Sequence, residues 1–169
     1  TVKFELADEP GTYFLAWTTT PWTLPSNLGL AVHPQLTYVC VEYEGSRYIV
    51  SKGLKEKIFG SEGKVTKSFS GKELKGKTYV PLFDFFKKHS KNAFHVFLAD
   101  FVSEEEGTGI VHMAPTGVDD APILEQNGIK LVYPFDENCY FNELVPPLKG
   151  VYFRHDPEVP GSKEQNAND

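Results

Sequence analysis

The sequence predicts a single, mostly β domain, a barrel that carries two or three short peripheral helices. Three observations favour this fold. The chain has 169 residues, the size of one ordinary domain that can bury a core without disulfides or a metal. It contains 13 Phe and 8 Tyr, and its 14 Gly and 12 Pro recur at short intervals. Aromatic residues are enriched in strands, whereas frequent Gly and Pro interrupt long helices, so this texture favours many short strands.

Each expected strand is a β-prone run that ends at Gly, Pro or a group of polar residues. Such runs of apolar, aromatic and β-branched residues are typical of strands. Glu44-Gly45-Ser46 separates two of them and predicts a hairpin turn. The expected strands are 13–17, 28–32, 37–43, 47–50, 65–69, 94–102, 108–113 and 131–133.

Helices are expected only as short pieces between the strands. Ser51 is expected to begin one helix that Gly60 ends. Asp119 or Asp120 is expected to cap another, which runs to about Gln126. These helices would lie at the periphery of the barrel.

The remaining segments are expected to be irregular. Pro21 and Pro25 argue against a helix between the first two strands. The segment 71–81 is rich in Lys and Gly and is expected to be a surface excursion that returns to the core. Residues 158–169 are polar and are expected to fray. The whole chain, 1–169, is thus interpreted as one domain.

Composition and charge argue against several classes of protein. The net charge of -6 disfavours a free-standing nucleic-acid-binding domain, because phosphate binding usually leaves a basic surface. Any RNA would be held locally or by another part of a larger protein. Cys40 and Cys139 form no Cys-x-x-Cys pair or zinc-type cluster, so both are expected as buried thiols. No metal or cofactor is expected in this domain.

The sequence lacks membrane-spanning runs, a signal peptide and the common hydrolase motifs. The apolar runs are too short to cross a bilayer and the N-terminus does not resemble a signal peptide, which predicts a cytoplasmic chain. The sequence contains no Gly-x-Ser-x-Gly elbow and no His-Glu-x-x-His. Serine hydrolases of the elbow type and zinc proteases therefore lose support.

Two segments carry a resemblance to a known family. The first runs from Ala16 to Asn27 (AWTTTPWTLPSN) and the second from Gly107 to Pro115 (GTGIVHMAP). Both resemble the editing-site signatures of isoleucyl-tRNA synthetases, and the resemblance extends over about 3–150. The motifs of the adenylate-forming site, His-x-Gly-His and Lys-Met-Ser-Lys-Ser, are absent. The resemblance implies the β-barrel-like editing domain (connective polypeptide 1, CP1) of a class I synthetase, separated from the part that activates the amino acid.

The resemblance also implies a reaction, the hydrolysis of valine wrongly attached to the tRNA for isoleucine. Asp120 would pair with the α-ammonium group of the substrate. Thr18, Thr19 and Thr20 would hold the ester, orient water and narrow the pocket. His112 would limit the size of the side-chain pocket rather than act as a general base, and its ring could hydrogen-bond a polar intruder. The resemblance implies no metal and no covalent enzyme nucleophile.

Three further residues are implied to bind substrate, and one loop departs from the family pattern. Trp17, Trp22 and Asn27 would shape the threonine loop and contact the nucleotide end. The loop 116–120 (TGVDD) is one residue shorter than usual and has Val where Glu is common. An alignment on its Gly assigns the ammonium contact to Asp120, with Asp119 as the second choice.

Structural explanations exist for the same residues. A Thr- and Pro-rich loop usually makes turns, a lone His on an apolar strand is more often a core residue, and paired Asp residues often cap a helix. Two other functions remain open, a binding module that holds the aminoacylated tRNA 3′ end without hydrolysis and a free-standing editing hydrolase. The expected partners are the tRNA(Ile) 3′ end carrying valine and the remainder of the parent synthetase, and the isolated domain is expected to be a monomer. Valyl-adenylate is a possible second substrate.

Overall fold

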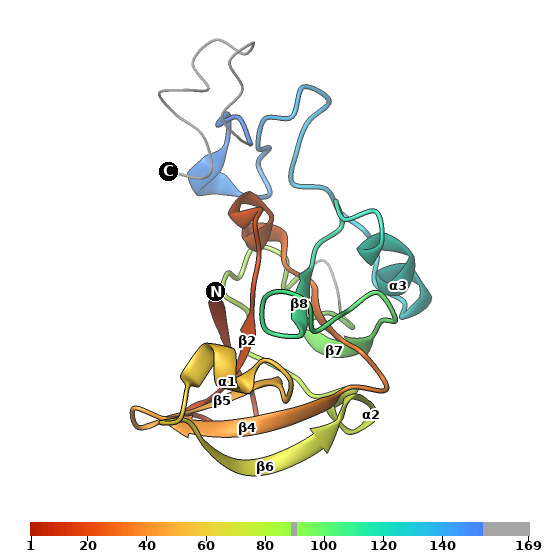
Figure 1. Cartoon of the computed structure of the whole chain (residues 1–169). Coiled ribbons are helices and arrows are strands. Elements are labelled where there is room, and N and C mark those ends of the chain that lie inside the picture. The colour runs from red at the N-terminus through yellow and green to blue at the C-terminus, as the bar shows by residue number, and fades with distance from the viewer. Residues whose placement is uncertain (89–90, 154–169) are drawn as a thin grey trace.

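The computed structural model describes residues 1–88 and 91–153 (Figure 1), so the tail expected to fray lies outside the described residues. Its larger sheet consists of β1 (Val2–Glu5), β2 (Thr12–Ala16), β4 (Thr37–Tyr43), β5 (Ser46–Ser51) and β6 (Lys64–Ser70). The strand order is β1-β2-β5-β4-β6. β2 runs parallel to β5, and the other neighbouring pairs are antiparallel. β4 and β5 form the hairpin predicted around Gly45.

A smaller sheet consists of β3 (Gly29–Val32), β7 (His95–Leu98) and β8 (Ile110–Met113), in the order β7-β3-β8. β3 is central, parallel to β7 and antiparallel to β8. All four residues of β3 are buried, as its continuous apolar run predicts. The two sheets meet where Trp17, directly after β2, forms a bridge with Val111 of β8. This junction brings the end of β2 beside β8.

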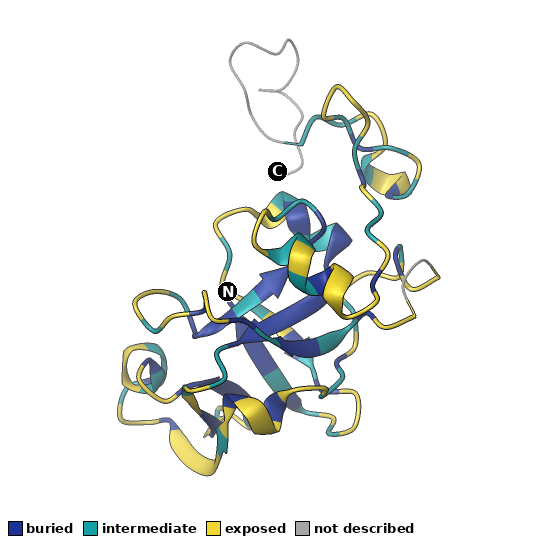
Figure 2. Cartoon of the chain, turned by 90° about the vertical axis from the view of Figure 1, so that its right-hand side faces the viewer, coloured by how far each residue is buried: buried dark blue, intermediate teal, exposed yellow. Residues whose placement is uncertain are grey.

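The mostly β class is confirmed, but the described strands do not close into the expected barrel. Within the described residues the strands form two open sheets and no closed barrel. β6 lies at one edge of the larger sheet and is exposed at nearly every position, so it does not close against β1. Figure 2 shows the buried positions concentrated in the strands at the centre of the molecule.

Short helices connect the strands. They are the 3-10 helices η1 (Pro21–Ser26) and η2 (Pro146–Leu148) and the α-helices α1 (Lys55–Phe59), α2 (Gly71–Leu74) and α3 (Asp120–Gln126). η1 forms although it contains Pro21 and Pro25: Pro21 lies in the first turn, where its missing N–H needs no partner, whereas Pro25 lies inside the short helix. The helix expected from Ser51 begins only at Lys55, since Ser51 still belongs to β5, and it ends at Gly60 as predicted. No helix in the described part of the chain has the length and apolar character needed to span a bilayer.

Apolar side chains from both sheets form the core. One cluster joins the sheets and includes Phe4, Phe14 and Leu30. A second cluster, which includes Met113 and Leu124, joins the smaller sheet to α3 and to the segment that follows it. Burial of each such side chain contributes about 1.5–3 kcal/mol. The candidate site lies where these two hydrophobic clusters meet.

Several local expectations are corrected by this packing. The segment 71–81 is exposed at several positions, as expected of a surface excursion, but it also contributes Leu74 and Tyr79, which are 0% and 2% exposed, to the first core cluster. The segment 131–133 forms no strand; Leu131 and Val132 pack against the second cluster without a neighbouring strand, and Tyr133 is exposed. Cys40 is buried as expected, but Cys139 is exposed and lies in a turn, where its φ is 65°.

Candidate functional site

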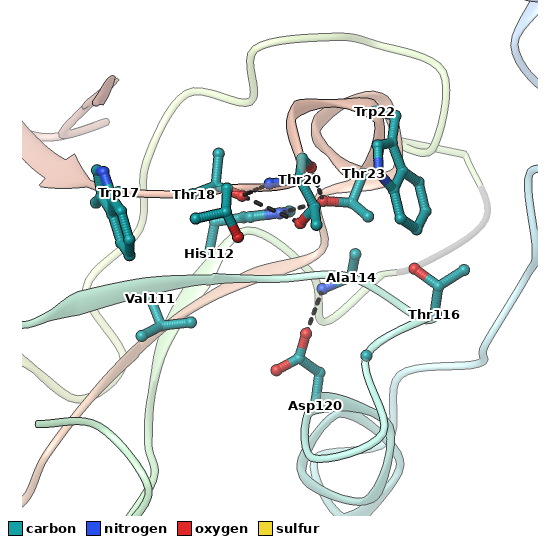
Figure 3. A pocket seen from close by; sticks show the side chains of 12 residues that line it. Trp17, Thr18, Thr20, Trp22, Thr23, Val111, His112, Ala114, Thr116 and Asp120 are labelled. Carbon is teal, nitrogen blue, oxygen red and sulfur yellow. Dashed lines mark hydrogen bonds between the residues drawn. The ribbon is translucent and has the colours of Figure 1, made fainter. Parts of the chain in front are cut away.

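A cavity of about 410 Å³ lies at the junction of the two sheets (Figure 3). Its walls come from the loop after β2, from η1, from β8 and from the loop that leads into α3. Segments almost a hundred residues apart in the sequence therefore face one another. The lining residues are Trp17, Thr18, Thr19, Thr20, Trp22, Thr23, Val111, His112, Ala114, Thr116, Gly117 and Asp120.

The three consecutive threonines form one wall of this cavity. The Oγ1 atom of Thr18 accepts a hydrogen bond from the backbone N–H of Thr20 (3.0 Å) and lies 3.2 Å from the Thr20 hydroxyl. Such a side-chain-to-backbone bond two residues along the chain stabilises a tight turn. Thr19 and Thr20 are exposed, so their hydroxyls remain accessible to a ligand. The Thr18 hydroxyl therefore stabilises the turn, and the Thr19 and Thr20 side chains are left exposed to a ligand in the cavity.

His112 projects from β8 into the back of the cavity and is 8% exposed. Its Nε2 atom lies 2.6 Å from the hydroxyl oxygen of Thr23, and that hydroxyl donates to the carbonyl oxygen of Thr20 (2.7 Å). The hydroxyl has one proton, so the hydrogen-bond network assigns the ring proton to Nε2. Nδ1 then accepts from the Asn27 side-chain amide at 3.2 Å. Both ring nitrogens are occupied.

Burial lowers the pKa of His112 to about 4. The imidazole is therefore neutral near pH 7, and with both nitrogens engaged it presents carbon atoms rather than a free acceptor to the cavity. This geometry fits a wall that limits size, and it does not provide the free nitrogen that the expected hydrogen bond to a polar intruder would need.

Asn27 is not among the cavity-lining residues, which corrects the expectation that it contacts the nucleotide end. It is 5% exposed and lies behind His112. Its amide nitrogen donates to the carbonyl oxygen of Gly29 (2.9 Å), and its Oδ1 atom accepts from the hydroxyl of Tyr79. Asn27 therefore positions His112 from within the core. The sequence motif predicts that Asn27 lies near the site, but only the fold shows that its side chain bonds to Gly29 of β3 and points into the core.

Asp120, at the start of α3, is the acidic side chain that lines the cavity, and no Lys or Arg lines it. Its Oδ2 atom accepts from the backbone N–H of Ala114 (3.0 Å). A Cβ on Gly117 would lie 2.1 Å from this oxygen, so glycine is required for the carboxylate to pack here. Asp119 is exposed, lies outside the cavity and makes no side-chain capping bond. The structure thus brings Asp120, and not Asp119, to the site.

The electrostatics around Asp120 suit a cationic ligand. Burial raises the pKa of the Asp120 carboxyl; the hydrogen bond from Ala114 opposes this shift, and the charge of Asp119 adds to it. A half-buried carboxylate without a cationic neighbour in the cavity is stabilised by any positively charged group that binds beside it. An ammonium group meets this requirement.

Two tryptophans lie at opposite ends of the cavity (Figure 3). Trp22 packs edge-on against Phe135 and Phe153, with ring centroids 5.7 and 4.7 Å away, which closes that end. Trp17 is 39% exposed. It also borders a second cavity of about 160 Å³, which shares Val111 with the first. We call the Trp22 end, which these aromatic rings back, the closed end, and the Trp17 end, which adjoins the second cavity, the open end.

Sequence reasoning missed several lining residues. Thr23, Val111 and Ala114 lie inside the two quoted motifs, and the 3-10 spacing from Thr20 to Thr23 was the available signal for the first of them. Thr116 and Gly117 lie in the shortened loop, where no local signal predicts which side chains face inward.

One further motif does not form a site. The run from Gly71 to Thr78 (GKELKGKT) fits the spacing of a phosphate-binding loop. That loop requires a helix to begin at its Lys-Thr end, and here an irregular segment follows. In the described residues there is also no group of three or more His, Cys, Asp or Glu side chains placed to hold a metal ion.

The buried state of His112 predicts a pH-dependent stability. The ordinary pKa of 6.5 applies to the unfolded chain, and the folded value is about 4. Above pH 6.5, His112 is neutral in both the folded and the unfolded state and does not reduce the stability. Between pH 6.5 and about 4, only the unfolded state binds the proton. The free energy of unfolding should therefore fall by up to about 1.4 kcal/mol per pH unit, or about 3 kcal/mol in total.

Urea unfolding near neutral pH and near pH 4.5 measures this effect. His112→Gln removes the titrating group, so the loss of stability between the two conditions should shrink by about 2–3 kcal/mol relative to the wild type. An equal pH dependence in both proteins would contradict the neutral, buried assignment of His112.

The chain is similar in sequence to isoleucine–tRNA ligases. It is 43% identical over 155 residues to the isoleucine–tRNA ligase of Bacillus thuringiensis (strain Al Hakam). This match covers 91% of the chain and 15% of the relative, so the chain spans about a seventh of the length of that enzyme. No protein-family model matches the chain.

The fold is similar to solved structures of editing domains. The structure described as GlLeuRS-CP1 aligns with a TM-score of 0.55 and 20% identity over 76% of this chain and 54% of its own. The editing domain of P. knowlesi cytosolic leucyl-tRNA synthetase aligns with a TM-score of 0.55 and 15% identity over 68% of this chain and 50% of its own. These likenesses show the fold, and the sequence match selects the isoleucine branch. The chain therefore belongs to the isoleucyl-tRNA synthetase family, of which it is a CP1 editing domain.

Proposed function

We propose that this chain hydrolyses the ester that links valine to the tRNA for isoleucine and excludes isoleucine by size. The observation that carries the proposal is the composition of the cavity: one carboxylate, Asp120, lies across from the threonine hydroxyls, and the neutral ring of His112 lies beside those threonines (Figure 3). The coarser role, proofreading in a tRNA synthetase, follows from the family and the fold.

The energetic need for such a second site is general. One extra methylene in an apolar pocket contributes only about 1–3 kcal/mol to discrimination, a limit for which isoleucyl-tRNA synthetases are the standard example. Valine is smaller than isoleucine and enters any pocket built for isoleucine. A second pocket that admits valine and rejects the larger side chain removes the error.

Asp120 supplies the recognition of the aminoacyl group. An aminoacyl ester carries an α-ammonium, which uncharged tRNA lacks, and the cavity has a single acidic lining side chain to receive it. A charge-assisted hydrogen bond from the ammonium to Asp120 would fix the ester carbonyl near Thr18, Thr19 and Thr20. Valyl-adenylate carries the same ammonium, so it satisfies the same contact.

Hydrolysis in this site relies on positioning and on stabilisation of the oxyanion. His112 has no free ring nitrogen and is neutral, so it does not serve as a general base in this arrangement. The threonine hydroxyls and nearby backbone N–H groups are donors that can face the carbonyl oxygen as negative charge develops on it. Water attacks the ester directly, with a ribose hydroxyl of the substrate as the group placed to assist. No metal or cofactor is part of this proposal.

The remainder of a synthetase completes the assembly. The chain carries a net charge of -6, which disfavours tight binding of a whole tRNA by this domain alone. We therefore propose that the rest of a longer, cytoplasmic enzyme delivers the 3′ end, with the terminal nucleotide at the Trp17 end of the cavity. Trp17 is exposed there and offers a ring face for stacking.

Deacylation of Val-tRNA(Ile) and Ile-tRNA(Ile) by this chain, and by the synthetase that contains it, tests the function. Selective loss of valine with the chain alone supports an editing hydrolase with its chemistry here. Activity only in the synthetase means that the domain needs the rest of the enzyme to position the tRNA. If both esters persist with both proteins, the chain is a binding module that has lost hydrolysis.

A further inference from the structure

Thr116 carries a hydroxyl that the site described so far does not use. The residue follows Pro115 in the loop between β8 and α3 and lines the cavity. Its Oγ1 atom is buried and has no hydrogen-bond partner among the residues that the structure describes. A buried polar atom without a partner is costly, and such atoms are rare in folded proteins. In a ligand cavity, the missing partner can be a group of the ligand.

The loop holds Thr116 in place. The N–H of Gly117 donates to the carbonyl oxygen of Ala114 (3.1 Å), and the N–H of Ala121 donates to the carbonyl oxygen of Gly117 (3.0 Å). Asp120 packs directly against Gly117 and bonds to the Ala114 N–H. The backbone on both sides of Thr116 is thus fixed by the same contacts that position the carboxylate.

Thr116 lies at the closed end of the cavity. Figure 3 shows Thr116 beside Ala114 on the side of Trp22, with Trp17 at the far end and Asp120 between them. Phe135 and Phe153 close the Trp22 end, whereas the Trp17 end adjoins the second cavity. A nucleoside is the larger part of the substrate and needs the open end. The amino-acid side chain therefore occupies the closed end, next to Thr116.

The hydroxyl of Thr23 and both ring nitrogens of His112 are already occupied. The hydroxyl of Thr23 donates to Thr20 and receives the Nε2 proton of His112, and Nδ1 of His112 faces the Asn27 amide. Two lining side chains at this end make no hydrogen bond among the described residues, the Trp22 indole N–H and Thr116, and the buried group of the two is the Thr116 hydroxyl. A methyl group of valine leaves it unpaired, and a hydroxyl in the same position satisfies it.

We propose that Thr116 determines specificity by hydrogen-bonding a hydroxyl on the side chain of the bound aminoacyl ester. Threonine has the shape of valine with one methyl replaced by a hydroxyl, so the pocket hydrolyses a threonyl ester at least as readily as a valyl ester. This inference rests on the proposed function and extends it from an apolar substrate to β-hydroxy amino acids.

The test compares kcat/KM for tRNA(Ile) charged with valine and with threonine, the latter prepared with an aminoacylating ribozyme. It is run on the chain and on the synthetase that contains it. Thr116→Val keeps the shape and removes the hydroxyl, so the ratio of kcat/KM for the threonyl ester to that for the valyl ester should fall by about 10-fold. Thr116→Ser keeps the hydroxyl and should retain the preference. Thermal unfolding of each variant confirms that it is folded.

The outcomes separate this inference from the function on which it rests. Wild-type hydrolysis of the valyl ester without the threonyl ester overturns the role of Thr116 and leaves the editing function intact. Equal losses on both esters in Thr116→Val also overturn it, because the hydroxyl would then contact a group common to both substrates. Persistence of both esters with the wild-type chain and the wild-type synthetase overturns the proposed function itself.

Discussion

Replacing Asp120 with Asn is expected to lower kcat/KM for deacylation of Val-tRNA(Ile) by roughly 100-fold or more, which equals at least about 2.7 kcal/mol of transition-state stabilisation. Asp120 is the acidic side chain that lines the cavity, so no neighbouring lining residue can replace its charge. A buried, charge-assisted contact to an ammonium is among the stronger hydrogen bonds in proteins. Deacylation of radiolabelled valyl-tRNA measures the effect.

The same substitution should leave the fold intact. Asn keeps an oxygen for the N–H of Ala114 and fits the space above Gly117. Burial raises the pKa of Asp120, so the folded state binds a proton more readily than the unfolded state does. Protonated Asp120 therefore stabilises the folded state at low pH, and this contribution is lost as the pH rises through the pKa of Asp120 in the folded state. Removal of the charge near neutral pH should therefore change the free energy of unfolding by less than about 1 kcal/mol.

Asp119→Asn is the matched control for this experiment. It makes the same chemical change at the next residue, which is exposed and lies outside the cavity. Its kcat/KM should stay within about 2-fold of the wild-type value. The reverse pattern, with activity lost in Asp119→Asn and retained in Asp120→Asn, would transfer the ammonium contact to Asp119.

The sequence predicts much of the site because its residues lie in two short runs that the fold brings together. The bridge between Trp17 and Val111 aligns the end of β2 with β8 and places the threonine run opposite His112. The structure gives the alignment on Gly117 a physical basis, since only glycine leaves room for the Asp120 carboxylate. At these positions the residues that the motifs predict for the site are the ones that the fold brings together.

Other features depend on contacts that no local pattern contains. Asn27 belongs to the same motif as the threonines, yet its bonds to Gly29 and Tyr79 draw it into the core. Tyr79 belongs to a segment whose Lys and Gly content predicts surface, but its ring packs against Phe4 with centroids 5.2 Å apart. The open sheets likewise follow from how β6 pairs with β4 at an exposed edge. Strand propensity predicts strands, and it does not predict whether a sheet closes.

Replacing His112 with Ala is expected to let the chain hydrolyse Ile-tRNA(Ile), so that the preference for the valyl over the isoleucyl ester falls by at least about 10-fold. The ring is the buried part of the wall between the threonines and β8, and its nitrogens are fixed by Thr23 and Asn27. Truncation to a methyl group leaves more space than the one methylene that distinguishes the two substrates. The ratio of kcat/KM for the two esters measures this change.

The variant also tests whether His112 acts through size or through chemistry. Loss of the ring and of two hydrogen bonds should lower the free energy of unfolding by about 2–4 kcal/mol, so selectivity is compared only in samples that unfold cooperatively. His95→Ala is the matched control, because His95 lies on neighbouring β7, bonds to the carbonyl oxygen of Ala93 (2.8 Å) and does not line the cavity. A catalytic base would instead lose valyl hydrolysis and gain no isoleucyl hydrolysis. A folded His112→Ala protein with wild-type selectivity would show that other residues, Trp22 foremost, set the size limit.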